Sequence, residues 1–205
     1  MGVDLSLKAI PKFGKRLIDK SELRKGTEYS NLLFHTFSAF QNEFCDFGNP
    51  DWIEFKNDAR TLLPYFNDEN YFEKFDLDTN RTYEALDYLI IQFQESKNFE
   101  PVEFRNFESF YYAGIECDFC RGGQGFILKY WDFEIIKKKK EIIDQLSFNE
   151  LYGKYNEADM IRQGVYKMEQ IKNSPREKLK MVFDKTKIFL ADARELGGYV
   201  LVCKD

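Results

Sequence analysis

The sequence is poor in the side chains that most often carry nucleophilic or metal chemistry. It holds one histidine, His35, and four cysteines in 205 residues. A Ser-His-Asp or Cys-His arrangement would have to use that single histidine, and no Gly-x-Ser-x-Gly turn occurs. We expect His35 on the polar side of a helix, facing solvent. Hydrolytic triads are therefore disfavoured, and no catalytic constellation or cofactor motif is recognisable.

Long apolar runs and a strong charge of one sign are absent as well. No stretch approaches the roughly 20 residues needed to span a bilayer, and residues 1–20 lack the apolar centre of a signal peptide. Four cysteines do not make a disulfide framework. A net charge of −5 gives no electrostatic footprint for nucleic acid or an anionic membrane. These absences predict a cytoplasmic protein that binds neither nucleic acid nor membrane.

Aromatic residues are abundant instead. The chain has 21 Phe and 12 Tyr, so we expect a core built largely on rings. Nothing repeats, and no Pro-rich or Ser/Gly-rich linker divides the chain. Residues 1–205 are therefore predicted to form a single domain.

The periodicity predicts a helix-rich α+β fold with a small sheet that includes the first and last strands. Strands are expected over Val3–Ile10, Phe126–Tyr130 and Tyr199–Cys203. Helices are expected over residues 17–23, 31–45, 50–63, 78–93, 132–146, 148–155, 158–163 and 175–196. Ser174 with Glu177 predicts a capping box at the start of the last helix, and Gly197 predicts its end.

Several segments, taken in their order along the chain, resemble the YfbM-like proteins, a bacterial family without assigned activity. The matching positions are Asp76-Leu77-Asp78, Tyr83, Leu86, Leu89, Leu146-Ser147, Leu151, Tyr155, Met160, Val165-Tyr166 and Gly197-Gly198. The resemblance implies an α+β fold and a bacterial origin, and it supplies no catalytic residues. The chain departs from the family pattern at Tyr83, Asp87 and Lys167, where Trp, His and Pro are usual.

The pair Cys117 and Cys120 is one candidate site. As half of a zinc site the pair needs two more ligands, because structural zinc is tetrahedral. The candidates His35 and Cys45 lie ten residues apart on one expected helix, about 15 Å along its axis, so they cannot both bind one ion. As a redox pair it lacks a following helix to stabilise a thiolate. The glycine-rich loop Arg121–Gly125 leads into a strand, so it does not fit a phosphate cradle. Structural thiols are the simplest interpretation, and an enzyme or a small-ligand or metal site at Cys117, Cys120 and Arg121 is the alternative.

Two further patterns have simpler explanations. Asp76-x-Asp78-x-Asn80 imitates a calcium loop, but Arg81 occupies the position that needs glycine. Lys139 falls among the isoleucines of its helix. Its stem either reaches past the edge of the core, or the helix is locally irregular, or the amine is buried and reactive.

The aromatic and acidic segment 99–119 is the favoured candidate for function. It interleaves rings with carboxylates, and a partner would contact Glu103, Phe107, Glu108, Tyr111, Tyr112 and Glu116. Rings anchor protein interfaces, and an acidic rim steers a basic partner. The sequence therefore predicts a non-catalytic protein-binding domain, of an immunity or regulatory kind. The alternative is that these rings complete the core.

Overall fold

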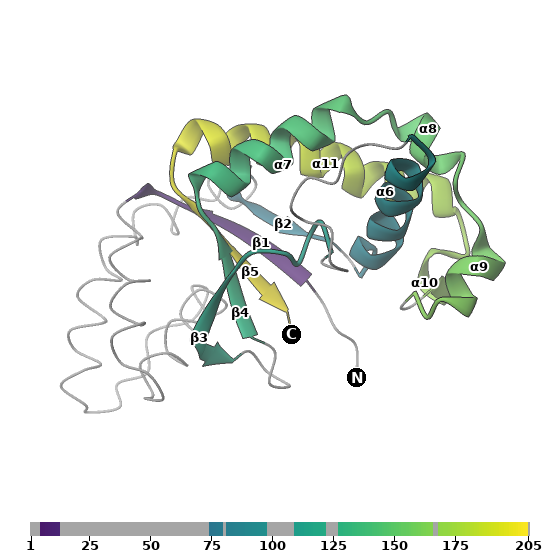
Figure 1. The fold of residues 1–205 in the computed structure, drawn as a ribbon, viewed down its shortest axis with the longest axis horizontal. Coiled ribbons are helices and arrows are strands. Elements are labelled where there is room, and N and C mark those ends of the chain that lie inside the picture. The colour runs from purple at the N-terminus through teal and green to yellow at the C-terminus, as the bar shows by residue number, and fades with distance from the viewer. Residues whose placement is uncertain are drawn as a thin grey trace.

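The computed structural model describes residues 5–12, 74–79, 81–97, 109–121, 127–165 and 168–204. They form an antiparallel five-stranded sheet with the order β2-β1-β5-β4-β3, covered by helices (Figure 1). The strands are β1 (Leu5–Ile10), β2 (Asp76–Asp78), β3 (Ile115–Arg121), β4 (Ile127–Trp131) and β5 (Tyr199–Lys204). The predicted α+β fold, with the first and last strands in one sheet, is confirmed.

The two terminal strands are neighbours at the middle of the sheet. β1 and β5 pair from Leu5 opposite Lys204 to Ile10 opposite Tyr199. Alternation directs Leu5 and Leu7 of β1 into the core, and Val200 and Val202 of β5 join the same core cluster. β5 is third in the order of the five described strands, between β1 and β4, and is therefore the central strand of the described sheet.

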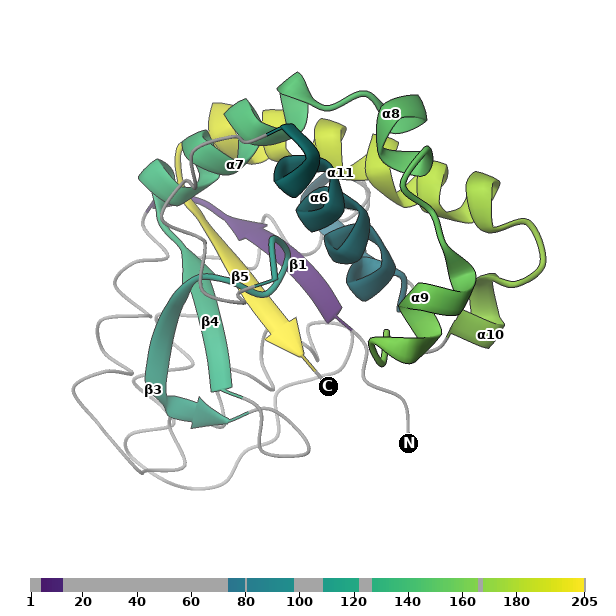
Figure 2. The same ribbon diagram turned by 45° about the vertical axis from the view of Figure 1, so that its right-hand side comes forward.

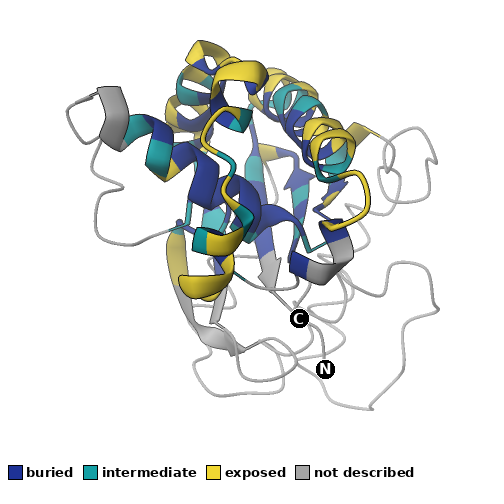
Figure 3. Ribbon diagram, turned by 90° about the vertical axis from the view of Figure 1, so that its right-hand side faces the viewer, coloured by how far each residue is buried: buried dark blue, intermediate teal, exposed yellow. Residues whose placement is uncertain are grey.

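The helices are α6 (Tyr83–Lys97), α7 (Phe133–Gln145), α8 (Phe148–Tyr152), α9 (Glu157–Arg162), α10 (Met168–Ile171) and α11 (Pro175–Leu196). α7 and α11 pack against each other and against the sheet, and α6 packs against α8 and α11 (Figure 2). The buried residues lie on the inner faces of these helices (Figure 3). Within the described ranges, no helix is long and apolar enough to cross a membrane.

Most helix boundaries follow from local chemistry. The Asp132 carboxylate accepts the Ile135 N–H at 2.8 Å, which caps the start of α7. Gly197 ends α11 with φ 66°, a left-handed conformation that glycine adopts without cost. The capping box predicted at Ser174 is wrong, because Ser174 itself has φ 65° and makes no side-chain cap. Its hydroxyl therefore does not reach the first turn, and Pro175 starts α11 instead.

One predicted helix begins later than expected. Residues 76–78 form β2, which pairs with β1, and α6 starts only at Tyr83. The Lys8 amine bonds the Asp76 carboxylate at 2.8 Å, so that this acid links β1 to β2. The helices predicted over residues 17–23, 31–45 and 50–63 lie outside the described residues.

Candidate functional site

The segment Ser109–Ala113, called the 109–113 turn below, leads directly to the start of β3. The Ala113 N–H donates to the Ser109 carbonyl at 2.7 Å, and the Tyr112 N–H donates to Ser109 Oγ at 2.8 Å. These bonds close the turn on itself. The N–H groups of Phe110 and Tyr111 point elsewhere, so their partners decide where the turn sits.

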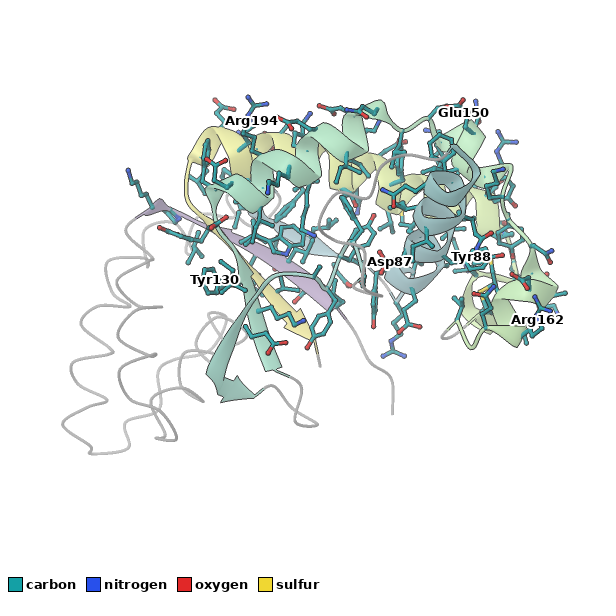
Figure 4. The ribbon with its side chains drawn as sticks, in the orientation of Figure 1. Asp87, Tyr88, Tyr130, Glu150, Arg162 and Arg194 are labelled. Carbon is teal, nitrogen blue, oxygen red and sulfur yellow. The ribbon has the colours of Figure 1, made fainter. Side chains whose placement is uncertain are left out.

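Asp87 of α6 accepts those remaining donors. Its carboxylate bonds the Tyr111 N–H at 3.3 Å and also accepts from the Phe110 N–H and the Ser109 hydroxyl. Asp87 is labelled in Figure 4. Burial raises the pKa of Asp87 to about 7, against the opposing effect of these hydrogen bonds and of the Lys139 charge.

Lys139 of α7 binds a carbonyl group of the same turn. Its side chain is fully buried, and its amine donates to the Phe110 carbonyl oxygen. The nitrogen also lies 4.5 Å from the centroid of the Trp131 ring. The expectations that this side chain reaches past the core edge, or that α7 is irregular here, are wrong, because α7 is continuous and Lys139 points inward. A carbonyl and ring faces replace the water that the ammonium group has lost.

Two more bonds fix the turn to the core. The Trp131 indole N–H donates to the Ala113 carbonyl at 2.5 Å. The Tyr111 hydroxyl lies 3.1 Å from Thr186 Oγ1, which itself donates to the Val182 carbonyl at 2.7 Å. The phenol is therefore the donor to Thr186. Burial raises the pKa of Tyr111, which keeps this phenol neutral.

The surface next to the turn carries the other predicted contact residues. Tyr112 is half-buried, and Lys129 of β4 lies over its ring at 4.5 Å. The same amine is 3.4 Å from the Glu116 carboxylate, whose side chain is 49% exposed. Ile115, the preceding residue of the strand, is 36% exposed, and its side chain points to the opposite face of β3. Tyr112 and Glu116 meet at the Lys129 amine and form a small surface patch, here called the β3 patch, at the start of an edge strand of the described sheet.

Gly114 sets the position of this patch. A Cβ atom there would lie 2.8 Å from the Tyr130 carbonyl and 2.9 Å from Trp131 Cδ1. Only glycine lets the chain pass this close to β4 on its way from the turn into β3.

The structure separates the predicted contact residues. Tyr112 and Glu116 lie together on the surface, whereas Tyr111 is fully buried and belongs to the core. Core packing was the alternative for these rings, and Tyr111 follows it. Glu103, Phe107 and Glu108 lie outside the described residues.

The alternative thiol site falls on β3. Cys117, Cys120 and Arg121 belong to that strand, where the pairing with β4 shifts register between Glu116 and Arg121. The cysteine pair therefore lies in extended backbone and not at the start of a helix. These three side chains and residues 122–125 lie outside the part of the chain that the structure describes. Within the described part, no group of three His, Cys, Asp or Glu side chains could hold a metal ion.

Sequence reasoning missed the role of Asp87. A signal was present, because Asp87 stands one helical turn after Tyr83, on the apolar face that α6 turns to the core. Lys139 stands on the apolar face of α7 in the same way. An acidic residue and a basic residue on the inward faces of two helices predict that both side chains are buried. The pattern does not indicate that both bind the 109–113 turn.

These features define an α+β domain in which two buried ionisable side chains, one acidic and one basic, secure a turn next to a surface patch. The chain belongs to the DUF1877 family, a domain of unknown function, whose family model matches residues 49–203. Searches of the curated proteins and of the solved structures found no significant match.

Proposed function

We propose that the chain is a non-catalytic protein-binding domain that presents the β3 patch and the acidic segment before it to a basic partner. The observation that carries the proposal is the exposed Glu116 carboxylate near the half-buried Tyr112 ring, at the start of β3, an edge strand of the described sheet. A ring beside a carboxylate offers both an apolar anchor and an attraction for a cation. An edge strand adds main-chain donors and acceptors that an extended partner segment can pair with.

The arrangement of the interior charges supports binding over catalysis. Asp87 accepts from the 109–113 turn, and Lys139 donates to it. Both groups are engaged in holding the chain's own backbone, and neither faces solvent. Their work is structural, and it positions the turn that leads to the patch.

The partner is proposed to be a protein, with neither nucleic acid nor membrane involved. The net charge of −5 supports a basic partner, and its approach would be steered by Glu103, Glu108 and Glu116. We further infer a YfbM-like, bacterial and cytoplasmic protein of an immunity or regulatory kind, on the resemblance described above.

Charge reversal tests the proposal directly. The tagged chain and its Glu103→Lys/Glu108→Lys/Glu116→Lys variant are used to capture partners from an extract of the source organism, at low and high salt. We expect a stoichiometric partner with the unaltered chain, and its loss with the variant and at high salt, because exposed charges are screened.

The matched control changes the net charge equally on another surface. Glu141, Glu150 and Glu177 are exposed on α7, α8 and α11. Their replacement by lysine should leave capture intact. Equal capture of the same partner by both triple variants would contradict the proposed surface.

A further inference from the structure

The 109–113 turn is attached to the core by two buried ionisable groups. Asp87 takes the N–H groups of Phe110 and Tyr111, and Lys139 takes the Phe110 carbonyl. The attachment thus depends on one carboxyl group from α6 and one amine from α7. A change in the protonation state of the carboxyl group therefore acts directly on the hydrogen bonds that hold the turn.

We propose that Asp87 makes the 109–113 turn a pH-sensitive strap, which is closed over the protonated carboxyl group and loosens when that group ionises. The closed turn shuts water away from a carboxyl group that is only 6% exposed. Lifting the turn hydrates this group, and hydration favours the ionised form. The closed state therefore binds the proton more tightly than the open state, and ionisation shifts the population toward opening.

The groups that face Asp87 set the balance between its protonated and ionised forms. Lys139 from α7 attracts the ionised carboxylate, and the Ser109, Phe110 and Tyr111 donors stabilise it. The Tyr83 hydroxyl of α6 also lies in its field, and burial raises the pKa of that phenol, so it stays neutral. Burial opposes ionisation more strongly than these groups favour it, which raises the pKa of Asp87 to about 7.

Opening of the strap would act on the proposed binding surface. The turn is joined through Gly114 to Ile115 and Glu116, and Tyr112 is part of both the turn and the patch. A loosened turn would leave the patch less ordered, and its partner would have to order it again on binding. This regulatory meaning rests on the proposed function, whereas the strap itself is a property of the free chain.

Amide hydrogen exchange on the isotope-labelled full chain tests the strap without a partner. Protection factors of the Phe110 and Tyr111 amides are measured between pH 5 and pH 8, with the amides of β1 and β5 as an internal reference. We expect the opening constant of the turn to rise by up to about tenfold per pH unit below pH 7 and to level off above it. The reference amides should not follow this course.

Two variants identify the titrating group. Asp87→Asn keeps the shape and removes the proton, so the turn amides should lose their pH dependence. His35→Gln removes the only histidine and should leave that dependence unchanged, although an ordinary histidine titrates in the same range. If Asp87→Asn fails to fold, Lys139→Met replaces it, and the level region should then move to higher pH.

The outcomes are distinct. Protection factors of the turn that stay constant from pH 5 to pH 8 in the unaltered chain would overturn the strap, as would unchanged pH dependence in Asp87→Asn. A partner lost on charge reversal at the patch, with no pH effect on the turn, would sink the strap and keep the proposed function. Turn amides that follow the expected pH dependence, together with unchanged partner capture by the charge-reversal variant, would support the strap and contradict the proposed function.

Discussion

The ammonium nitrogen of Lys139 lies 4.5 Å from the centroid of the Trp131 ring, on a side chain with 0% exposure. The ring of Phe110 is a second neighbour at 4.8 Å. These contacts make Lys139 part of the packing of α7 on β4 as well as the holder of a carbonyl group. Each of the two roles can be removed separately.

Lys139→Met should destabilise the fold by about 1–3 kcal/mol at neutral pH, because the Phe110 carbonyl loses its donor while the buried stem is kept. Lys139→Ala should cost more, about 3–5 kcal/mol, because it also removes the packing of the buried stem, whereas both variants remove the charge near Asp87. Urea unfolding measures both. Lys137→Met, on the exposed face of the same helix, is the control, and a loss equal to that of Lys139→Met would contradict the assignment.

The Tyr111–Thr186 bond predicts an asymmetry between its two partners. Tyr111→Phe should cost about 0.5–1.5 kcal/mol, because Thr186 Oγ1 still donates to the Val182 carbonyl. Thr186→Val should cost about 1–3 kcal/mol, because it leaves the buried Tyr111 hydroxyl without its acceptor. Unfolding free energies of the two single variants and the double variant check this. Equal costs for the two single variants would mean that the phenol is not the donor.

Gly114→Ala should destabilise the protein by about 1–3 kcal/mol and shift the emission of Trp131, because the added methyl group meets backbone and an indole ring. Gly197→Ala is the matched control. It strains a positive φ, but its Cβ would have no heavy atom within 4 Å. It should cost about 1 kcal/mol with no change in Trp131 emission. A fluorescence change in the control would show that the signal reports general destabilisation.

Tyr88→Phe should raise the pKa of Asp159. The Tyr88 hydroxyl donates to this carboxylate at 2.7 Å, and that hydrogen bond is the largest cause of the lowered pKa of Asp159. A lowered pKa in the folded state stabilises the fold above the ordinary value of about 3.9, and this contribution is lost as the pH falls below it. The variant should therefore show a smaller loss of stability between pH 5 and pH 3.

Carboxyl NMR titration and acid unfolding measure these two effects of Tyr88→Phe. Tyr155→Phe is the control, since the Tyr155 hydroxyl is buried with no hydrogen-bond partner among the described residues. Its removal should cost little and leave the titration of Asp159 unchanged. An unaltered Asp159 pKa in Tyr88→Phe would mean that Arg162 and Gln163 hold this carboxylate alone.

Local sequence patterns predicted correctly those helices and strands whose hydrophobic period and boundary residues indicate the same structure. The helix predicted over residues 132–146 is α7, and the final strand predicted from Tyr199 is β5. The helix predicted from residue 78 starts too early, and the short strand β2 was not predicted, because three residues are too few to show a period and their extended form comes from pairing with β1. Serine is a common N-cap residue, but Ser174 does not adopt the N-cap conformation. The local sequence does not indicate this difference.

The site was less accessible to sequence reasoning because its bonds join distant residues. Asp87, Ser109, Lys139 and Thr186 come from three helices and a turn, and no spacing rule brings them together. The aromatic and acidic composition singled out a segment that includes the 109–113 turn. It did not distinguish Tyr111, which turns inward, from Tyr112, which lies at the surface, since adjacent residues of a turn share their composition and differ only in direction.

The pairing of β1 with β5 sets the order in which this fold is completed. The ribosome makes β5 after every other described strand and helix, yet β5 is the strand that joins β1 to β4. Until it emerges, the β2–β1 and β4–β3 pairs have no common partner and each shows an unpaired edge. Such long-range closure is slow, and nascent chains with open edges are prone to aggregate. Truncation within Tyr199–Lys204 should therefore yield insoluble protein and not a smaller stable domain.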